Sequence, residues 1–134
     1  MIAADTSVVV AALAGWHEGH HAASAAIAGG VRLPAHCLLE AYSVLTRLPP
    51  PHRFEPGVAR NLLRSRFPDA PLTLDGQAHG ALLDRLVEAR ISGGAAYDAL
   101  IGATAAEHDA LLLSRDQRAT RVYATLGVRF DLVA

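Results

Sequence analysis

The stretch Ile2-Ala3-Ala4-Asp5-Thr6-Ser7 joins an apolar run directly to three residues that cap helices. The run is short enough for a buried strand, and Asp, Thr and Ser side chains accept hydrogen bonds from the first backbone N–H groups of a helix. We therefore expect a strand over residues 2–4 that passes into a helix ending at about Leu13. A strand followed at once by a helix is the repeating unit of α/β proteins.

Outward from this unit, glycines and prolines divide the chain into alternating short apolar runs and longer segments with helical spacing. The expected strands are residues 2–4, 31–33, 72–74, 111–113 and 128–132. The expected helices are residues 5–13, 17–28, 38–48, a short one opening at Pro56, and 76–90, 97–108 and 118–126. Wholly apolar strands that alternate with helices indicate a parallel sheet covered on both faces. The expected fold class is α/β, a three-layer α/β/α sandwich with a central parallel sheet of about five short strands.

Length and composition narrow the possible functions. A chain of 134 residues without a linker-like segment is expected to form a single domain over residues 1–134. All 12 basic residues are arginine, and the absence of lysine excludes P-loop phosphate binding and Schiff-base catalysis. A formal net charge of −1 gives no global cationic field, so any contact with nucleic acid must come from a local patch.

The cysteine content and the hydropathy pattern suggest a cellular location. Cys37 is the only cysteine, so neither an intramolecular disulfide nor a CxxC zinc pair is possible. No window reaches the roughly 18 continuous apolar residues that a membrane span requires. We therefore expect a soluble, cytoplasmic protein that does not contact the membrane.

Four carboxylates fall beside the predicted strands, where open parallel sheets bind their ligands. Asp5 follows the first strand, Glu40 lies in the helix after the second, and Asp98 and Asp116 flank the fourth. Carboxylates crowded among apolar residues repel one another unless a cation neutralises them. Mg²⁺ or Mn²⁺ prefers such hard oxygen donors and activates water for attack on a phosphodiester. The pattern favours metal-dependent hydrolysis of a phosphate ester, although a single acid in such a position is more often a helix cap or a solvated side chain.

Four segments together are typical of one known family. They are Asp5-Thr6-Ser7, Glu40-Ala41-Tyr42-Ser43-Val44-Leu45-Thr46-Arg47, Tyr97-Asp98-Ala99-Leu100-Ile101 and Leu113-Ser114-Arg115-Asp116. Each motif alone is weak, whereas their order and spacing are specific. Over nearly its whole length, the chain resembles PIN-domain ribonucleases, in particular VapC-type toxins of type II toxin–antitoxin pairs.

The resemblance implies roles for particular residues. Asp5, Glu40 and Asp98 match the principal acids around Mg²⁺ or Mn²⁺, and Asp116 matches a fourth acid whose loss would weaken rather than abolish activity. Thr6 and Ser114 match the hydroxyl-bearing positions of the site. The resemblance also implies a PIN-like fold and endoribonuclease activity on RNA, with tRNA or another structured RNA as the expected substrate. Its implied protein partners are a cognate antitoxin, whose C-terminal segment occupies a groove, and a second copy of the chain in a homodimer.

Arginines form two local clusters that could grip an RNA backbone or meet the antitoxin. The first cluster comprises Arg53, Arg60, Arg64 and Arg66, and the second comprises Arg115, Arg118 and Arg121. Each cluster exceeds its neighbouring acids in charge, which is the local patch that a weakly acidic chain needs to bind a polyanion. A solvated helix face explains the same pattern without any ligand.

Two alternative functions remain open from the sequence. His17-Glu18-Gly19-His20-His21 satisfies the H-E-x-x-H pattern of zinc metalloproteases, which requires both outer histidines on one helical face. Gly19 weakens any helix that would present them. The second alternative is a PIN-like module that binds metal or RNA without catalysis, because a complete set of acids indicates competence rather than turnover.

Overall fold

A computed structural model describes residues 1–134, and its centre is a parallel sheet. The three strands are β1 (Ile2–Ala4), β2 (Leu111–Ser114) and β3 (Phe130–Leu132), in the order β1-β2-β3. Ile2 pairs with Leu111, and Leu112 pairs with Phe130. The central strand β2 thus joins the two ends of the chain.

The expectation of about five strands is wrong in number, because two of them are reduced to single bridges. Arg32 forms an isolated parallel bridge with Ala3, and Leu72 forms one with Pro34. Both bridges extend the sheet on the β1 side in the parallel sense that the sequence predicted. Pairing stops there because Pro34 has no backbone N–H and a helix begins at the next residue.

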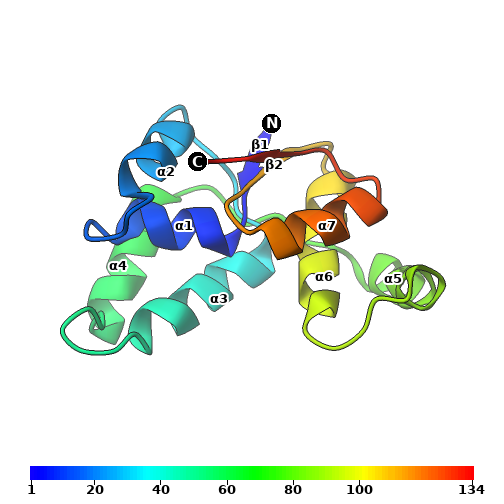
Figure 1. The fold of residues 1–134 in the computed structure, drawn as a ribbon, viewed down its shortest axis with the longest axis horizontal. Helices are drawn as coiled ribbons and strands as arrows, with labels where there is room; N and C mark the ends of the chain where they lie inside the picture. The colour runs from blue at the N-terminus through cyan, green and yellow to red at the C-terminus, as the bar shows by residue number, and fades with distance from the viewer.

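Seven helices surround the sheet (Figure 1). They are α1 (Thr6–Leu13), α2 (His20–Ile27), α3 (Ala35–Thr46), α4 (Pro56–Arg66), α5 (Gly76–Ala89), α6 (Ala95–Glu107) and α7 (Gln117–Thr125). The predicted helices match these within a few residues at most ends. The largest deviations at a helix start are in α2 and α3. Helix α3 was expected from residue 38 but begins at Ala35. Helix α2 was expected from His17 but begins at His20, because residues 15–19 form turns and a bend.

The helices cover both faces of the sheet, which confirms the three-layer architecture. Along β1 and β2, Ala4 and Leu113 pack into one hydrophobic cluster with α1–α4, whereas Ala3 and Leu112 pack into another with α6 and α7. This division follows from the alternation of side chains along a strand. Figure 1 shows α1, α2, α3 and α4 gathered on one side of the strands, with α6 and α7 on the other and α5 outermost.

None of the seven helices is both long enough and apolar enough to span a lipid bilayer.

Candidate metal centre

Four carboxylates from distant parts of the chain line one small pocket. Asp5, Glu40, Asp98 and Asp116 all contribute to its wall, and the pocket volume is about 50 Å³. Asp5 and Asp116 stand directly after β1 and β2, which run parallel and therefore end at the same edge of the sheet. Asp98 lies in the first turn of α6, and Glu40 lies in the middle of α3. The structure thus brings together all four acids that the sequence singled out.

Asp5 is nearly inaccessible and is held through both of its carboxylate oxygens. It caps α1 by accepting hydrogen bonds at Oδ1 from the Ser7 N–H and hydroxyl and from the Val8 N–H. Its Oδ2 accepts a hydrogen bond of 2.9 Å from the hydroxyl of Tyr123, a side chain with no exposed surface. Burial raises the pKa of Asp5, while the nearby hydroxyls of Ser114, Ser7 and Tyr123 oppose that rise.

Asp98 experiences the repulsion of the other three acids. Burial, followed by the charges of Asp116, Glu40 and Asp5, raises its pKa to about 6, and His36 opposes the shift. A carboxyl group whose pKa lies near neutrality among like charges is typical of functional sites. The pocket therefore concentrates negative charge that its own residues do not neutralise.

Glu40 is paired within its own helix. Its Oε2 lies 3.3 Å from Nε2 of His36, one turn earlier in α3. The His36 ring also stacks on Tyr97, with the ring planes 8° apart. Neither His36 nor Tyr97 was singled out as a site residue from the sequence.

Asp116 is exposed and caps α7. Its Oδ1 accepts hydrogen bonds from the backbone N–H groups of Arg118 and Ala119, and its own N–H donates to Oγ of the fully buried Ser114. Ser114 therefore orients Asp116 without itself lining the pocket. The other predicted hydroxyl, that of Thr6, is buried at the pocket and forms no hydrogen bond of ordinary geometry, although the Cys37 thiol lies close enough to interact with it.

The four carboxylates have the chemistry that a hard divalent cation prefers. In this structure, however, they are not spaced so that three of them could coordinate one ion together. Carboxylate oxygens are the ligands that Mg²⁺ and Mn²⁺ prefer, and no amine offsets their charge. No three histidine, cysteine or acidic side chains anywhere in the chain are arranged so that they could hold one ion. Oε2 of Glu40 faces His36, whereas Oδ2 of Asp5 accepts only the Tyr123 hydroxyl and keeps a lone pair for a cation.

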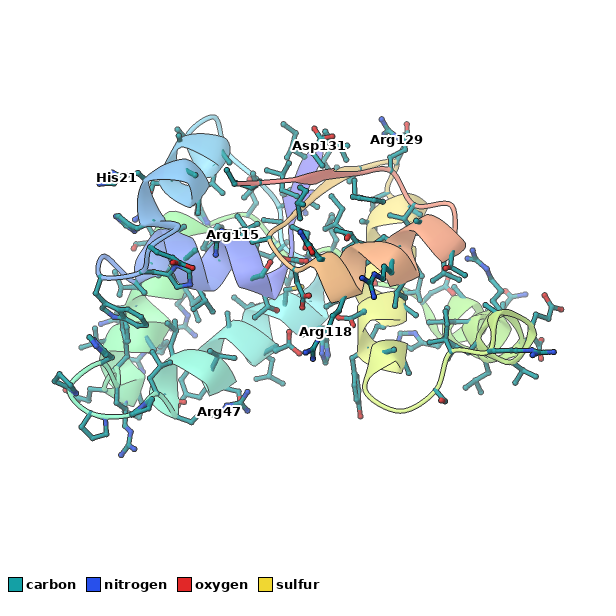
Figure 2. The ribbon with its side chains drawn as sticks, in the orientation of Figure 1. His21, Arg47, Arg115, Arg118, Arg129 and Asp131 are labelled. Carbon is teal, nitrogen blue, oxygen red and sulfur yellow. The ribbon has the colours of Figure 1, made fainter.

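The H-E-x-x-H motif lacks the helix that zinc proteases require. Because α2 begins at His20, His17 precedes the helix and His21 lies within it, so the two do not share a helical face. Nδ1 of His17 accepts a hydrogen bond from the N–H of Gly19. Figure 2 shows His21 at the outer edge of the molecule beside α2, far from Arg118 at the start of α7.

The arginines divide between structural and exposed roles. Nε of Arg115 donates to the backbone oxygen of Ala134, and Arg47 donates to Oγ of Ser43. Arg118 is exposed next to Asp116, and Figure 2 places it below the start of α7, on the side of α3 and α6. The first arginine cluster lies on and just before α4, and none of its members lines the acidic pocket.

Two hydroxyl groups that contact Asp5 were missed by sequence reasoning. Ser7 was explained by helix capping alone, yet its hydroxyl both donates to Asp5 and accepts from the N–H of Arg115, which ties α1 to the loop after β2. Tyr123 lies 118 positions from Asp5. No local pattern signals such a contact, because it depends on how α7 packs against the sheet.

Comparison with known proteins identifies relatives over the full chain. The PIN-domain family pattern matches residues 2–124. The chain is 50% identical over 133 residues to Ribonuclease VapC40 of Mycobacterium tuberculosis, covering 99% of both chains. It is 43% identical to Ribonuclease VapC27 of the same species, covering 99% of this chain and 97% of the relative.

Two solved structures share the fold at low sequence identity. FitAB bound to an IR36 DNA fragment gives a TM-score of 0.71 at 21% identity, covering 98% of this chain and 94% of the other. VapBC2 from Rickettsia felis, bound to a DNA fragment from its promoter, gives a TM-score of 0.68 at 14% identity, covering 98% of each chain. At these identities the likeness concerns the fold alone.

Proposed function

The chain belongs to the PIN-domain family, and from that premise we propose that it is a divalent-metal-dependent endoribonuclease, the toxin of a toxin–antitoxin pair. The observation that carries this proposal is the convergence of four carboxylates on one pocket at the carboxyl edge of the sheet. The names of relatives that are 50% and 43% identical over nearly the whole chain support RNA as the substrate class.

The proposed ligands of Mg²⁺ or Mn²⁺ are Asp5, Glu40, Asp98 and Asp116. When bound, such an ion supplies an activated water and offsets charge that develops on the phosphodiester. The protein's part is to hold the carboxylates in place, and Asp5 is fixed for this by Ser7 and Tyr123. Because Glu40 is bonded to His36, metal binding competes with that contact.

The remaining polar groups at the site have supporting roles in this proposal. Ser114 orients Asp116 through its backbone N–H, so that the fourth acid faces the pocket from the start of α7. The unsatisfied Thr6 hydroxyl is a further oxygen that could bond a ligand or a water in the pocket. Below about pH 6, the Asp98 carboxyl holds a proton, which a cation must displace.

RNA, with tRNA or another structured RNA as the family-level expectation, is the proposed substrate. An acidic pocket repels phosphates, so cationic side chains at its edge are needed to attract the backbone. Arg118 and Arg121 are exposed on α7, the helix that Asp116 caps. We also propose that the protein forms one domain over residues 1–134 and acts in the cytoplasm. The free thiol of Cys37 is compatible with that reducing compartment.

We place the antitoxin segment in a groove between α3 and α4, the α3–α4 groove. Leu38, Tyr42 and Leu63 contribute apolar surface to the groove, Arg60 and Arg64 contribute positive charge, and its volume is about 470 Å³. A segment that presents both apolar and acidic side chains complements this lining. Arg60→Glu combined with Arg64→Glu is expected to abolish co-purification of the antitoxin, and unchanged co-purification would argue against this placement.

The homodimer is proposed to use exposed apolar surface on α5. Leu83 and Val87 lie one turn apart on this helix and are 65% and 79% exposed. Apolar side chains grouped in this way commonly mark an interface. Light scattering is expected to give twice the chain mass for the native protein and the chain mass for Val87→Glu, whereas equal masses would place the interface elsewhere.

The direct test of the proposed activity is cleavage of a cellular RNA pool by purified protein free of antitoxin. We expect fragments with Mg²⁺ or Mn²⁺, none with EDTA, none from Asp5→Asn, and normal cleavage by His17→Ala. No cleavage by the folded, metal-supplied native protein would favour the non-catalytic module. Loss of a zinc-dependent activity in His17→Ala would favour the metalloprotease instead.

A further inference from the structure

An exposed aromatic ring is linked to two of the pocket acids, to Asp98 by sequence and to Glu40 through His36. Tyr97 directly precedes Asp98 in the first turn of α6, and 57% of its surface is exposed. One face of its ring lies parallel to the His36 ring, with the ring centroids 5.2 Å apart and the planes 8° apart. Core packing does not explain an aromatic side chain that stacks on another ring with one face and leaves most of its surface exposed to solvent.

The stacked pair is fixed relative to the acids. Tyr97 and His36 come from different helices, α6 and α3, and each of these helices carries one of the carboxylates. His36 is additionally bonded to Glu40 through Nε2. The Tyr97 ring is therefore preorganised at a set position beside the acidic pocket, which reduces the entropy lost when a ligand binds to it.

The surroundings of the ring select the chemistry of its ligand. The carboxylates of Asp98, next in sequence, and of Glu40, bonded to His36, are the charged groups nearest to the ring along these links. Negative charge on Asp98 and Glu40 disfavours a phosphate directly over the ring. A flat, uncharged ring suits this position, and a nucleobase is the part of RNA with that character. Bases inside a duplex already stack on each other, so the base must be unpaired.

We propose that Tyr97, backed by His36, stacks against an unpaired nucleobase of the RNA and so positions the neighbouring phosphodiester at the acidic pocket. This inference rests on the proposed ribonuclease function and specifies its substrate as single-stranded or extruded at the cut. Tyr97 is a substrate-binding residue in this proposal, and His36 is a positioning residue that holds its ring.

Binding and steady-state kinetics with ring variants test the contact. With a labelled single-stranded RNA in Ca²⁺, Tyr97→Ala is expected to raise Kd by about tenfold, and Tyr97→Phe to leave it within about twofold, because the ring face is kept. Tyr97→Leu, apolar but without a ring, should resemble Tyr97→Ala. In cleavage assays, the defect of Tyr97→Ala should appear mainly in KM.

Trp16→Ala is the matched control. Trp16 is also exposed and its ring contacts that of a histidine, His52, at a tilt of 31°, but it follows α1 at the end opposite Asp5. This variant should bind RNA as the native protein does. An equal loss of affinity in Trp16→Ala and Tyr97→Ala would overturn the proposal, as would an unchanged Kd and KM in Tyr97→Ala. Dissociation of a dimer by Tyr97→Ala would also overturn it, by assigning the ring to an interface between copies.

A spectroscopic measurement separates failure of this inference from failure of the proposed function. In a Trp16→Phe background, Tyr97→Trp introduces the only indole of the chain. Single-stranded RNA should quench its fluorescence, whereas the same sequence in a perfect duplex should not. Quenching without metal-dependent cleavage would support the contact while rejecting the enzyme, and cleavage without quenching would do the reverse.

Discussion

At the scale of single residues, Asp5 combines a structural and a proposed chemical role. Through Oδ1 it caps α1, and through Oδ2 it receives the Tyr123 hydroxyl inside the core. Hydrogen-bond donors favour the charged form of a buried carboxylate and limit the pKa increase that burial causes. Tyr123 thus links the packing of α7 to the ionisation of Asp5.

Removal of the Tyr123 hydroxyl tests this link. Because the hydroxyl and its acceptor are both buried, Tyr123→Phe is expected to lower the free energy of unfolding by about 1–2 kcal/mol. Urea denaturation measures this change. Tyr42→Phe, a partly exposed tyrosine in the α3–α4 groove, is the control and should change stability by less than about 0.5 kcal/mol. Equal effects of the two variants would contradict the role assigned to the bond.

The raised pKa of Asp98 predicts how metal-free stability varies with pH. Its pKa is about 6 in the folded protein against 3.8 for an unperturbed aspartate, so the folded state binds the proton more tightly. The resulting stabilisation is complete below about pH 4 and is lost as the pH rises through 6. In EDTA, Asp98→Asn should therefore flatten the fall in Tm between pH 4.5 and 7.

A carboxylate outside the pocket provides the control for this pH dependence. Asp131 is exposed on β3, and Figure 2 shows it at the opposite edge of the molecule from Arg47. Asp131→Asn should leave the pH dependence of Tm unchanged. A profile for Asp98→Asn that parallels that of the native protein would show that Asp98 does not carry the shifted pKa.

The sequence was sufficient to select the acids but not their partners. Asp5, Glu40, Asp98 and Asp116 could be chosen because each lies beside a strand or in a motif typical of one family. Contacts such as Tyr123 with Asp5 depend on helix packing between distant segments, for which one sequence contains no signal. The Tyr97–His36 stack likewise requires the relative placement of α3 and α6.

At the scale of elements, the helices were easier to predict than the strands. Helical spacing, caps and prolines marked every helix, whereas residues 31–33 and 72–74 contain the apolar run of a strand but form only one bridge each. The extent of strand pairing depends on the partner strand. Pro34 also ends the pairing locally by lacking an N–H.

Two helical glycines provide a prediction at this scale. A Cβ on Gly102 of α6 would lie 3.0 Å from Cδ1 of Tyr123 and 3.2 Å from Cγ2 of Val128, whereas a Cβ on Gly80 of α5 would meet no atom within 4 Å. Alanine favours a helix over glycine by about 1 kcal/mol. We expect Gly80→Ala to stabilise the protein by about 0.5–1 kcal/mol.

Crowding at the α6–α7 contact should reverse that gain for the second glycine. Gly102→Ala is expected to lower the free energy of unfolding by about 1 kcal/mol, because overpacking outweighs the helix preference. Thermal and urea denaturation of both variants provide the comparison. A stabilised Gly102→Ala would mean that α7 shifts without cost, and the Tyr123 contact would then not constrain Asp5.

At the scale of the whole molecule, the fold brings four carboxylates that are distant in sequence to one edge of the sheet. The strands β1 and β2 run parallel although residues 5–110 separate them, so Asp5 and Asp116 reach the same pocket at the carboxyl edge of the sheet. Helices on the two faces of the sheet, α3 and α6, then add Glu40 and Asp98. The three-layer arrangement was predictable from the alternation of strands and helices, whereas the present spacing of the carboxylates was not.

The most direct test of the proposed metal site is the initial rate of RNA cleavage at saturating Mn²⁺ across a panel of single acid-to-amide variants. We expect Asp5→Asn, Glu40→Gln and Asp98→Asn each to lose about a hundredfold or more, and Asp116→Asn to lose less. Glu18→Gln, which removes the acid of the H-E-x-x-H motif, should retain the native rate. Native rates in Asp98→Asn and Glu40→Gln, or loss of activity in Glu18→Gln, would contradict the assignment of catalysis to the acidic pocket.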